Sequence, residues 1–176
     1  MPEEEELAAL ARAIEAGEDG IAVPPELLEE PAQPAPPPPR SLYAQILAMG
    51  VAEKLKLALR GNKDARQILV RDTNKLIRRC VLQNPRIGDG EVLAIARNRS
   101  ADEELIRGIT EHREWMRNYQ VQLALATNPK TPLVVALKQV AALAERDLRQ
   151  IAKSKNVPQA VAAQARRVLF AARAAR

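Results

Sequence analysis

The dipeptide Asn-Pro follows two apolar, helix-forming stretches, and this repetition limits what the chain can fold into. It occurs as Asn84-Pro85 after Val81-Leu82-Gln83, and as Asn128-Pro129 after Leu125-Ala126-Thr127. Proline has no amide hydrogen to donate, and it pushes the preceding residue out of the helical region. Asparagine tolerates the left-handed conformation that often ends a helix. Each Asn-Pro therefore predicts the end of one helix and a new direction for the next.

The spacing of these joints indicates repeats of irregular length. Asn84 and Asn128 are 44 residues apart, and half of that shift, 22 residues, aligns Asn62 with Asn84. Position 106 holds no equivalent asparagine. Helix pairs that recur and bury one face against the next pair are typical of α-solenoids. We therefore expect degenerate helical repeats.

The composition also favours an all-α fold. Hydrophobic residues make up 47 % of the 176 residues but aromatic residues only 2 %, so the apolar content is mainly Ala, Leu, Val and Ile. Alanine and leucine are strong helix formers, and no alternating β-branched runs occur. The apolar spacing predicts helices over residues 42–60 with a break at Gly50, 63–71, 73–83, 90–98, 103–111, 113–127, 132–144, 146–154 and from Pro158 onward. The short connections predict that consecutive helices pack antiparallel.

Several of these helices have recognisable N-terminal signals. Ser41 is a plausible N-cap for the first helix of the body, and Asn62 precedes the short third helix. Ser100 and Glu103 match a capping box. Thr131 is a predicted N-cap with Pro132 at the first helical position, which proline favours.

The first 40 residues differ from the rest of the chain. Residues 1–40 carry ten acidic and two basic side chains, whereas the remainder carries 12 acidic and 25 basic ones. Eight of the 13 prolines lie between Pro24 and Pro39, which predicts a semi-rigid spacer, with a ligand for a proline-recognition module as the alternative. We predict a disordered acidic arm over residues 1–40, with a short helix at 3–16 that ends at Gly17, and a helical repeat domain over 41–176. The arm either remains a solvated tail or docks on the basic body.

A resemblance supports this architecture. The stretch from Leu125 to Pro132, followed by an apolar helix, resembles the Asn-Pro joint of leucine-rich repeat variant proteins, which are bacterial solenoids similar in shape to HEAT and armadillo repeats. Residues 42–170 also resemble an uncharacterised bacterial family with such joints. The resemblance implies a curved scaffold without enzymatic activity, here a right-handed α-solenoid of short antiparallel helices. The chain lacks the cysteine cluster that binds iron–sulfur groups in some such proteins, so we expect no cofactor.

The chain offers little for catalysis or metal binding. Cys80 is the only cysteine and lies on an apolar helical stripe, so we interpret it as a buried small hydrophobe. His112 is the only histidine and has no second histidine or cysteine cluster beside it, which argues against zinc. A nucleophilic pair of Cys80 and His112 remains open at this point. We expect a non-enzymatic protein.

Basic residues at helical spacing are the predicted binding surface. They are Arg71, Lys75, Arg78, Arg79, Arg113, Arg117, Arg146, Arg149 and Lys153. The favoured hypothesis is a scaffold that binds a protein or peptide partner, and the alternative is nucleic-acid binding through the phosphate backbone. An ordinary charged surface would give the same pattern. No apolar run approaches the ~20 residues that span a bilayer, and acidic residues replace a basic leader, so we expect a cytoplasmic protein without membrane insertion.

Overall fold

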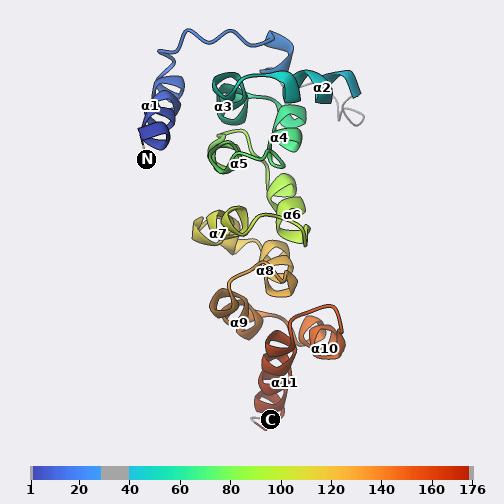
Figure 1. The fold of residues 1–176 in the computed structure, drawn as a ribbon. Coiled ribbons are helices and arrows are strands. Elements are labelled where there is room, and N and C mark those ends of the chain that lie inside the picture. The colour runs from blue at the N-terminus through green and yellow to red at the C-terminus, as the bar shows by residue number, and fades with distance from the viewer. Residues whose placement is uncertain (1, 29–39, 175–176) are drawn as a thin grey trace. The chain divides into compact units, whose positions relative to one another are not determined.

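The computed structural model describes residues 2–28 and 40–174, and the regular secondary structure of these residues is entirely helical, without a strand (Figure 1). They divide into two compact units, Met1–Ile87 and Gly88–Arg176. The all-α prediction is therefore confirmed for the described part of the chain. The predicted boundary at residue 41 lies inside the first unit, because the arm before it contributes to the same core.

The described residues of the first unit form five α-helices and one turn of 3-10 helix. They are α1 (Pro2–Ala16), η1 (Pro25–Leu27), α2 (Arg40–Ala48), α3 (Val51–Arg60), α4 (Lys63–Leu69) and α5 (Lys75–Gln83). In Figure 1, α3 lies between α1 and α5 on one side, and α2 and α4 lie on the other. Leu55, Ala58 and Ile77 belong to the core that these helices share.

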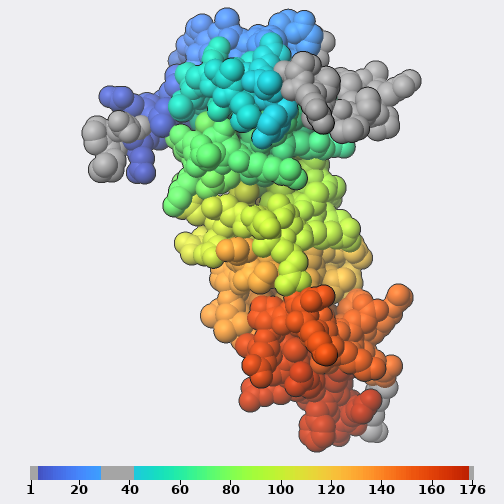
Figure 2. All heavy atoms as spheres, turned by 45° about the vertical axis from the view of Figure 1, so that its right-hand side comes forward, coloured from blue at the N-terminus to red at the C-terminus, as the bar shows by residue number. Residues whose placement is uncertain are grey.

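The described residues of the second unit form six α-helices, and the space-filling view of Figure 2 colours this part of the chain from yellow-green to red. These helices are α6 (Asp89–Arg97), α7 (Glu103–Glu111), α8 (Tyr119–Thr127), α9 (Leu133–Ala142), α10 (Glu145–Lys153) and α11 (Gln159–Ala174), with η2 (Trp115–Arg117) before α8. Helix α8 packs against α6 and α9, while α11 packs against α9 and α10. Val140, Leu148 and Val161 lie in the core between the last three helices.

The described part of the acidic arm is folded onto the first unit, so the predicted disorder is not confirmed there. Helix α1 packs on α3 and buries Ile14 completely. Gly17 ends α1 with a φ of +77°, and its amide donates to the Ile14 carbonyl at 3.1 Å. Glycine suits this left-handed position because it has no Cβ. The predicted end of this helix is confirmed, while the proline-rich run at residues 36–39 lies outside the described residues.

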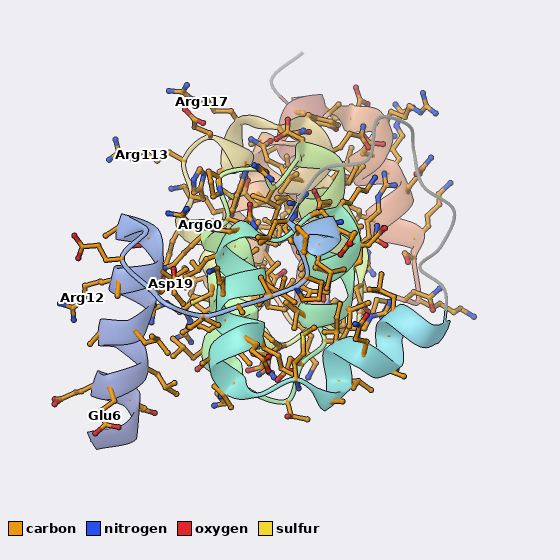
Figure 3. The ribbon with its side chains drawn as sticks, turned by 90° about the horizontal axis from the view of Figure 1, so that it is seen from above. Glu6, Arg12, Asp19, Arg60, Arg113 and Arg117 are labelled. Atoms are coloured by element: carbon orange, nitrogen blue, oxygen red, sulfur yellow. The ribbon has the colours of Figure 1, made fainter. Side chains whose placement is uncertain are left out.

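Two side chains of α3 tie the arm down. The Arg60 guanidinium donates to the Glu15 carbonyl at 2.8 Å, beside the end of α1, while Arg12 points away on the other side of that helix (Figure 3). The Lys56 ammonium lies 2.7 Å from the Asp19 carboxylate and also donates to the Ile21 carbonyl. This hydrogen bond from Lys56 lowers the pKa of Asp19.

The predicted N-terminal signals are correct in part. Asn62 caps α4 as predicted, and its Oδ1 accepts from the Ala65 amide at 3.1 Å. The capping box at Ser100 is wrong, since Asp102 caps α7 by accepting from the Glu104 amide at 2.9 Å. Helix α2 begins one residue before Ser41.

Two further predictions around the second Asn-Pro are wrong. The single helix over residues 113–127 is split into η2 and α8, because the extended backbone of Asn118 ends the first and its side chain caps the second. Helix α9 begins at Leu133 with Pro132 in the N-cap position, so Thr131 is not the cap. The Thr131 hydroxyl is buried and has no hydrogen-bond partner among the described residues.

Candidate functional site

The second unit contains a groove between α8 and α10, with a volume of about 450 Å³. Helix α8 contributes Gln120, Leu123, Ala124 and Thr127, and helix α10 contributes Asp147, Gln150 and Ile151, followed by Ser154. Residues three, four and seven apart lie on one face of a helix. One complete face of each helix therefore lines the groove.

The end of α6 adds two arginines to the lining, Arg97 and Arg99. Both are exposed, and neither forms an ion pair with a carboxylate of the described residues. Arg97 donates one hydrogen bond, at 3.3 Å, to the neutral carboxamide of Gln120. The groove therefore presents guanidinium groups whose charge no described carboxylate neutralises at close range.

The acidic residue of the lining is held by a tyrosine. The Tyr119 hydroxyl donates to the Asp147 carboxylate and accepts from the Ala144 amide at 3.1 Å. Burial and the hydrogen bond to Asp147 raise the pKa of Tyr119, so it remains a neutral donor at physiological pH. This contact joins the start of α10 to the start of α8 and keeps the two faces of the groove in place.

The second Asn-Pro joint fixes the other end of α8. Asn128 is buried, and its Nδ2 donates to the carbonyls of Ala96 at 2.7 Å and Asn98 at 3.0 Å, at the end of α6. Its Oδ1 accepts from the Lys130 amide at 2.9 Å. The side chain thus connects the C-terminal ends of α6 and α8, and it holds Arg97 and Arg99 beside the groove.

The first unit contains the same arrangement of hydrogen bonds at Asn84. Asn84, after α5, is buried and donates from Nδ2 to the carbonyls of Ala58 at 2.9 Å and Gly61 at 3.2 Å, at the end of α3. Its Oδ1 accepts from the Arg86 amide at 2.9 Å. Both asparagines have extended backbones, with ψ of 122° and 123°, so the predicted left-handed conformation is wrong. Both residues are at most 3 % exposed, and the distant carbonyls supply the partners that a buried amide requires.

Asn62 also donates hydrogen bonds to backbone carbonyls of an earlier segment. It is buried, its Nδ2 donates to the Glu26 carbonyl at 2.9 Å, and its backbone amide donates to the Leu27 carbonyl at 2.6 Å. The asparagines that the 22- and 44-residue shifts align therefore all bind backbone carbonyls of an earlier element.

The predicted basic residues of the first unit lie around the start of α5. Arg71, Lys75 and Arg79 are exposed. Arg78 is half-buried, and its Nη1 donates to the carbonyls of Asp72 and Thr73 in the turn before the helix. Arg78 therefore stabilises that turn, which leaves its guanidinium less available to a partner than those of Arg71 and Arg79.

The predicted basic residues of the second unit are all exposed. Arg113 and Arg117, on either side of the buried Trp115, extend away from the helices (Figure 3). Arg146, Arg149 and Lys153 lie on α10, and Arg149 pairs with Glu145 at 2.6 Å. None of these five residues lines the groove. The sequence reasoning missed Arg97 and Arg99, which flank Asn98 at the end of α6 and are not part of a longer run of basic residues at helical spacing.

Cys80 and His112, the two side chains that the sequence offered as a nucleophilic pair, lie in different surroundings. Cys80 is buried in the core of the first unit, where burial raises its pKa to about 11. His112 is exposed and stacks on Trp115 with ring centroids 3.9 Å apart. Within the described residues, no cluster of His, Cys, Asp and Glu side chains could hold a metal ion. Over the same residues, every helix is too short or too polar to cross a membrane.

Comparison of the chain with models of known protein families, with curated proteins and with solved structures yields no match.

Proposed function

We propose that the protein is a non-enzymatic scaffold of α-solenoid-type helical repeats, similar to leucine-rich repeat variant and HEAT proteins, that binds a protein or peptide partner. The observation that carries the proposal is the asparagine bond that recurs in both units. In each, a buried asparagine after one helix donates to the carbonyls that end an earlier helix. A recurring link of this kind is expected of repeats, each of which is stabilised by its neighbour.

The groove between α8 and α10 supports a binding role for the repeats. Its apolar floor and polar margins are the usual composition of a ligand site. Helical repeats generally bind partners through such surfaces between successive helices. The proposal assigns no reaction to the chain.

Site-specific crosslinking tests the scaffold proposal. A photo-reactive amino acid at Gln150, which is exposed and lines the groove, should crosslink to a specific protein in cells that express the chain. The matched control places the same group at Gln159, which is exposed at the start of α11 and does not line the groove. Crosslinks of equal yield and identity from both positions, or none from either, would contradict the proposal.

Nucleic-acid binding is a second candidate, favoured by the exposed basic residues without a carboxylate partner among the described residues. Arg71, Arg79, Arg113 and Arg117 are of this kind. Binding would depend on phosphate contacts and would weaken steeply with salt. A gel-shift titration with single- and double-stranded oligonucleotides at ~50 mM salt tests this candidate. Absence of a shift at micromolar protein would dismiss it.

A further inference from the structure

Two arginines line the groove without a carboxylate partner among the described residues. Arg97 and Arg99 lie two positions apart, line the same groove and form no ion pair within the described residues. A guanidinium group binds a carboxylate through two parallel hydrogen bonds. Two neighbouring arginines can therefore bind two carboxylates, which adjacent acidic side chains of a peptide supply. The single carboxylate of a peptide C-terminus would bind only one of the two arginines.

The floor of the groove is aliphatic. Ile151 is 3 % exposed and Ala124 is 7 % exposed, and the half-buried Leu123 and Val157 lie beside them. Ile151 and Ala124 have little surface left to cover, so the exposed parts of Leu123 and Val157 provide the apolar surface whose burial by an aliphatic side chain is favourable. The floor therefore selects a leucine, isoleucine or valine next to the acidic residues.

The margins carry carboxamides that can bind a peptide backbone. Gln120, Gln150 and Asn156 are exposed and line the groove. Each carboxamide both donates and accepts, which is what the free N–H and C=O groups of an extended chain require. The α8 face from Gln120 to Thr127 spans ~10 Å at a rise of 1.5 Å per residue. About three residues of extended peptide cover that length.

We infer that this groove binds an extended segment of a protein partner in which acidic side chains adjoin an aliphatic residue. The carboxylates contact Arg97 and Arg99, and the aliphatic side chain lies on Leu123, Ile151 and Val157. The inference rests on the proposed scaffold function and specifies the chemistry of its partner.

The lining favours a peptide over a nucleic acid. No aromatic side chain lines the groove, so bases would find no surface on which to stack. The carboxylate of Asp147 lies in the lining and repels any anion. A nucleic acid carries a phosphate at every nucleotide, whereas the acidic residues of a peptide can be confined to the positions beside Arg97 and Arg99. An extended peptide can place an amide or an uncharged side chain at that position.

Selection from a displayed library of random hexapeptides on the immobilised full chain tests the inference. We expect enrichment of peptides with Asp or Glu beside Leu, Ile or Val. For a selected peptide, the double substitution Arg97→Glu, Arg99→Glu should weaken binding at least about tenfold, because it removes charge-assisted hydrogen bonds. The double substitution Arg97→Gln, Arg99→Gln should also weaken binding, and circular dichroism verifies the fold of both variants.

The matched control carries Arg167→Glu and Arg173→Glu, which make the same change of net charge on exposed positions of α11 outside the groove. It should bind the selected peptide like the wild type. Selected peptides without acidic residues, binding that survives both changes at Arg97 and Arg99, or no enrichment would overturn the inference. Displacement of the peptide by a single-stranded oligonucleotide at ~50 mM salt, dependent on the same arginines, would reassign the groove to nucleic acid. The crosslinking result at Gln150 is independent of peptide composition, so it separates failure of this inference from failure of the scaffold proposal.

Discussion

The substitution Asn128→Ala should destabilise the second unit by about 1.5–4 kcal/mol. The Ala96 carbonyl is at a fully buried residue and would lose its donor at 2.7 Å, which costs about 1–3 kcal/mol for an unsatisfied buried group. The Asn98 carbonyl, on a half-buried residue, loses a bond at 3.0 Å and adds only about 0.5–1 kcal/mol, because the Ala101 amide still donates to it at 3.1 Å. The Lys130 amide is at an exposed residue and contributes little.

Urea unfolding of the full chain, followed by circular dichroism, measures this loss. The control Asn156→Ala changes an exposed asparagine of the same unit and should alter the unfolding free energy by less than about 0.5 kcal/mol. Equal effects of the two substitutions would refute the idea that the buried asparagine links α6 to α8. In that case the recurring Asn-Pro would only end helices.

A change to aspartate tests the direction of the hydrogen bonds. Asn128→Asp replaces the donor by a carboxylate that faces the carbonyl oxygens of Ala96 and Asn98. Burial and the two facing carbonyl oxygens would raise the pKa of the new carboxyl group above its unfolded value, and the single hydrogen bond from the Lys130 amide opposes this only in part. Stability should therefore decrease as pH rises, so the difference from wild type should be larger at pH 7 than at pH ~4. A loss independent of pH would contradict the donor role.

Three further outcomes follow from the first unit. Gly61→Ala should lower the free energy of unfolding in urea by ~1–3 kcal/mol, because the added Cβ would lie 2.3 Å from the Leu57 carbonyl oxygen. The control Gly90→Ala places its Cβ where no atom lies within 4 Å and should leave the free energy of unfolding unchanged. Equal effects of the two substitutions would contradict this explanation. Cys80 should react only slowly with a thiol reagent at pH 8 until urea unfolds the chain, and rapid reaction of the folded chain would contradict its burial. Burial raises the pKa of Cys80 from 9.0 to about 11, so the free energy of unfolding should also decrease as pH rises through that range. The folded-state pKa of Asp19 is lowered, so its ion pair with Lys56 stabilises the docked arm at pH values above the usual carboxyl pKa of 3.8, and this contribution is lost as pH falls through the lower folded value. Asp19→Asn at pH 7 should therefore accelerate hydrogen exchange of the amides in α1. Unchanged exchange would refute the role of the ion pair.

The sequence allowed most helices to be located because their ends depend on few neighbouring residues. Gly17, Gly50 and Asn62 mark helix ends that the structure has at the same places. Where two polar residues compete for one cap, the local pattern was insufficient. Ser100 and Asp102 both suit an N-cap, and only the packing of α7 decides which turn becomes helical.

The candidate site was not predictable in the same way. The predicted basic residues were chosen by helical spacing, and that spacing identifies an exposed face without indicating what lies beside it. Arg97 and Arg99 became candidates because faces of α8 and α10 border the same groove. The contribution of α1 to the core was equally hidden, since a four-turn amphipathic helix is marginal alone and is stabilised by burial of Ile14 against distant residues.

The two Asn-Pro joints separate what each level of structure determines. The sequence by itself determined that a helix stops before Asn84 and Asn128, because proline restricts the residue before it and cannot continue the hydrogen-bond ladder. Only the tertiary structure decided that the asparagine side chains are buried and donate to carbonyls 26 and 32 residues earlier. A hydrogen bond over such a distance forms only when packing brings the two helix ends together. The same packing creates the groove that we propose as the binding site.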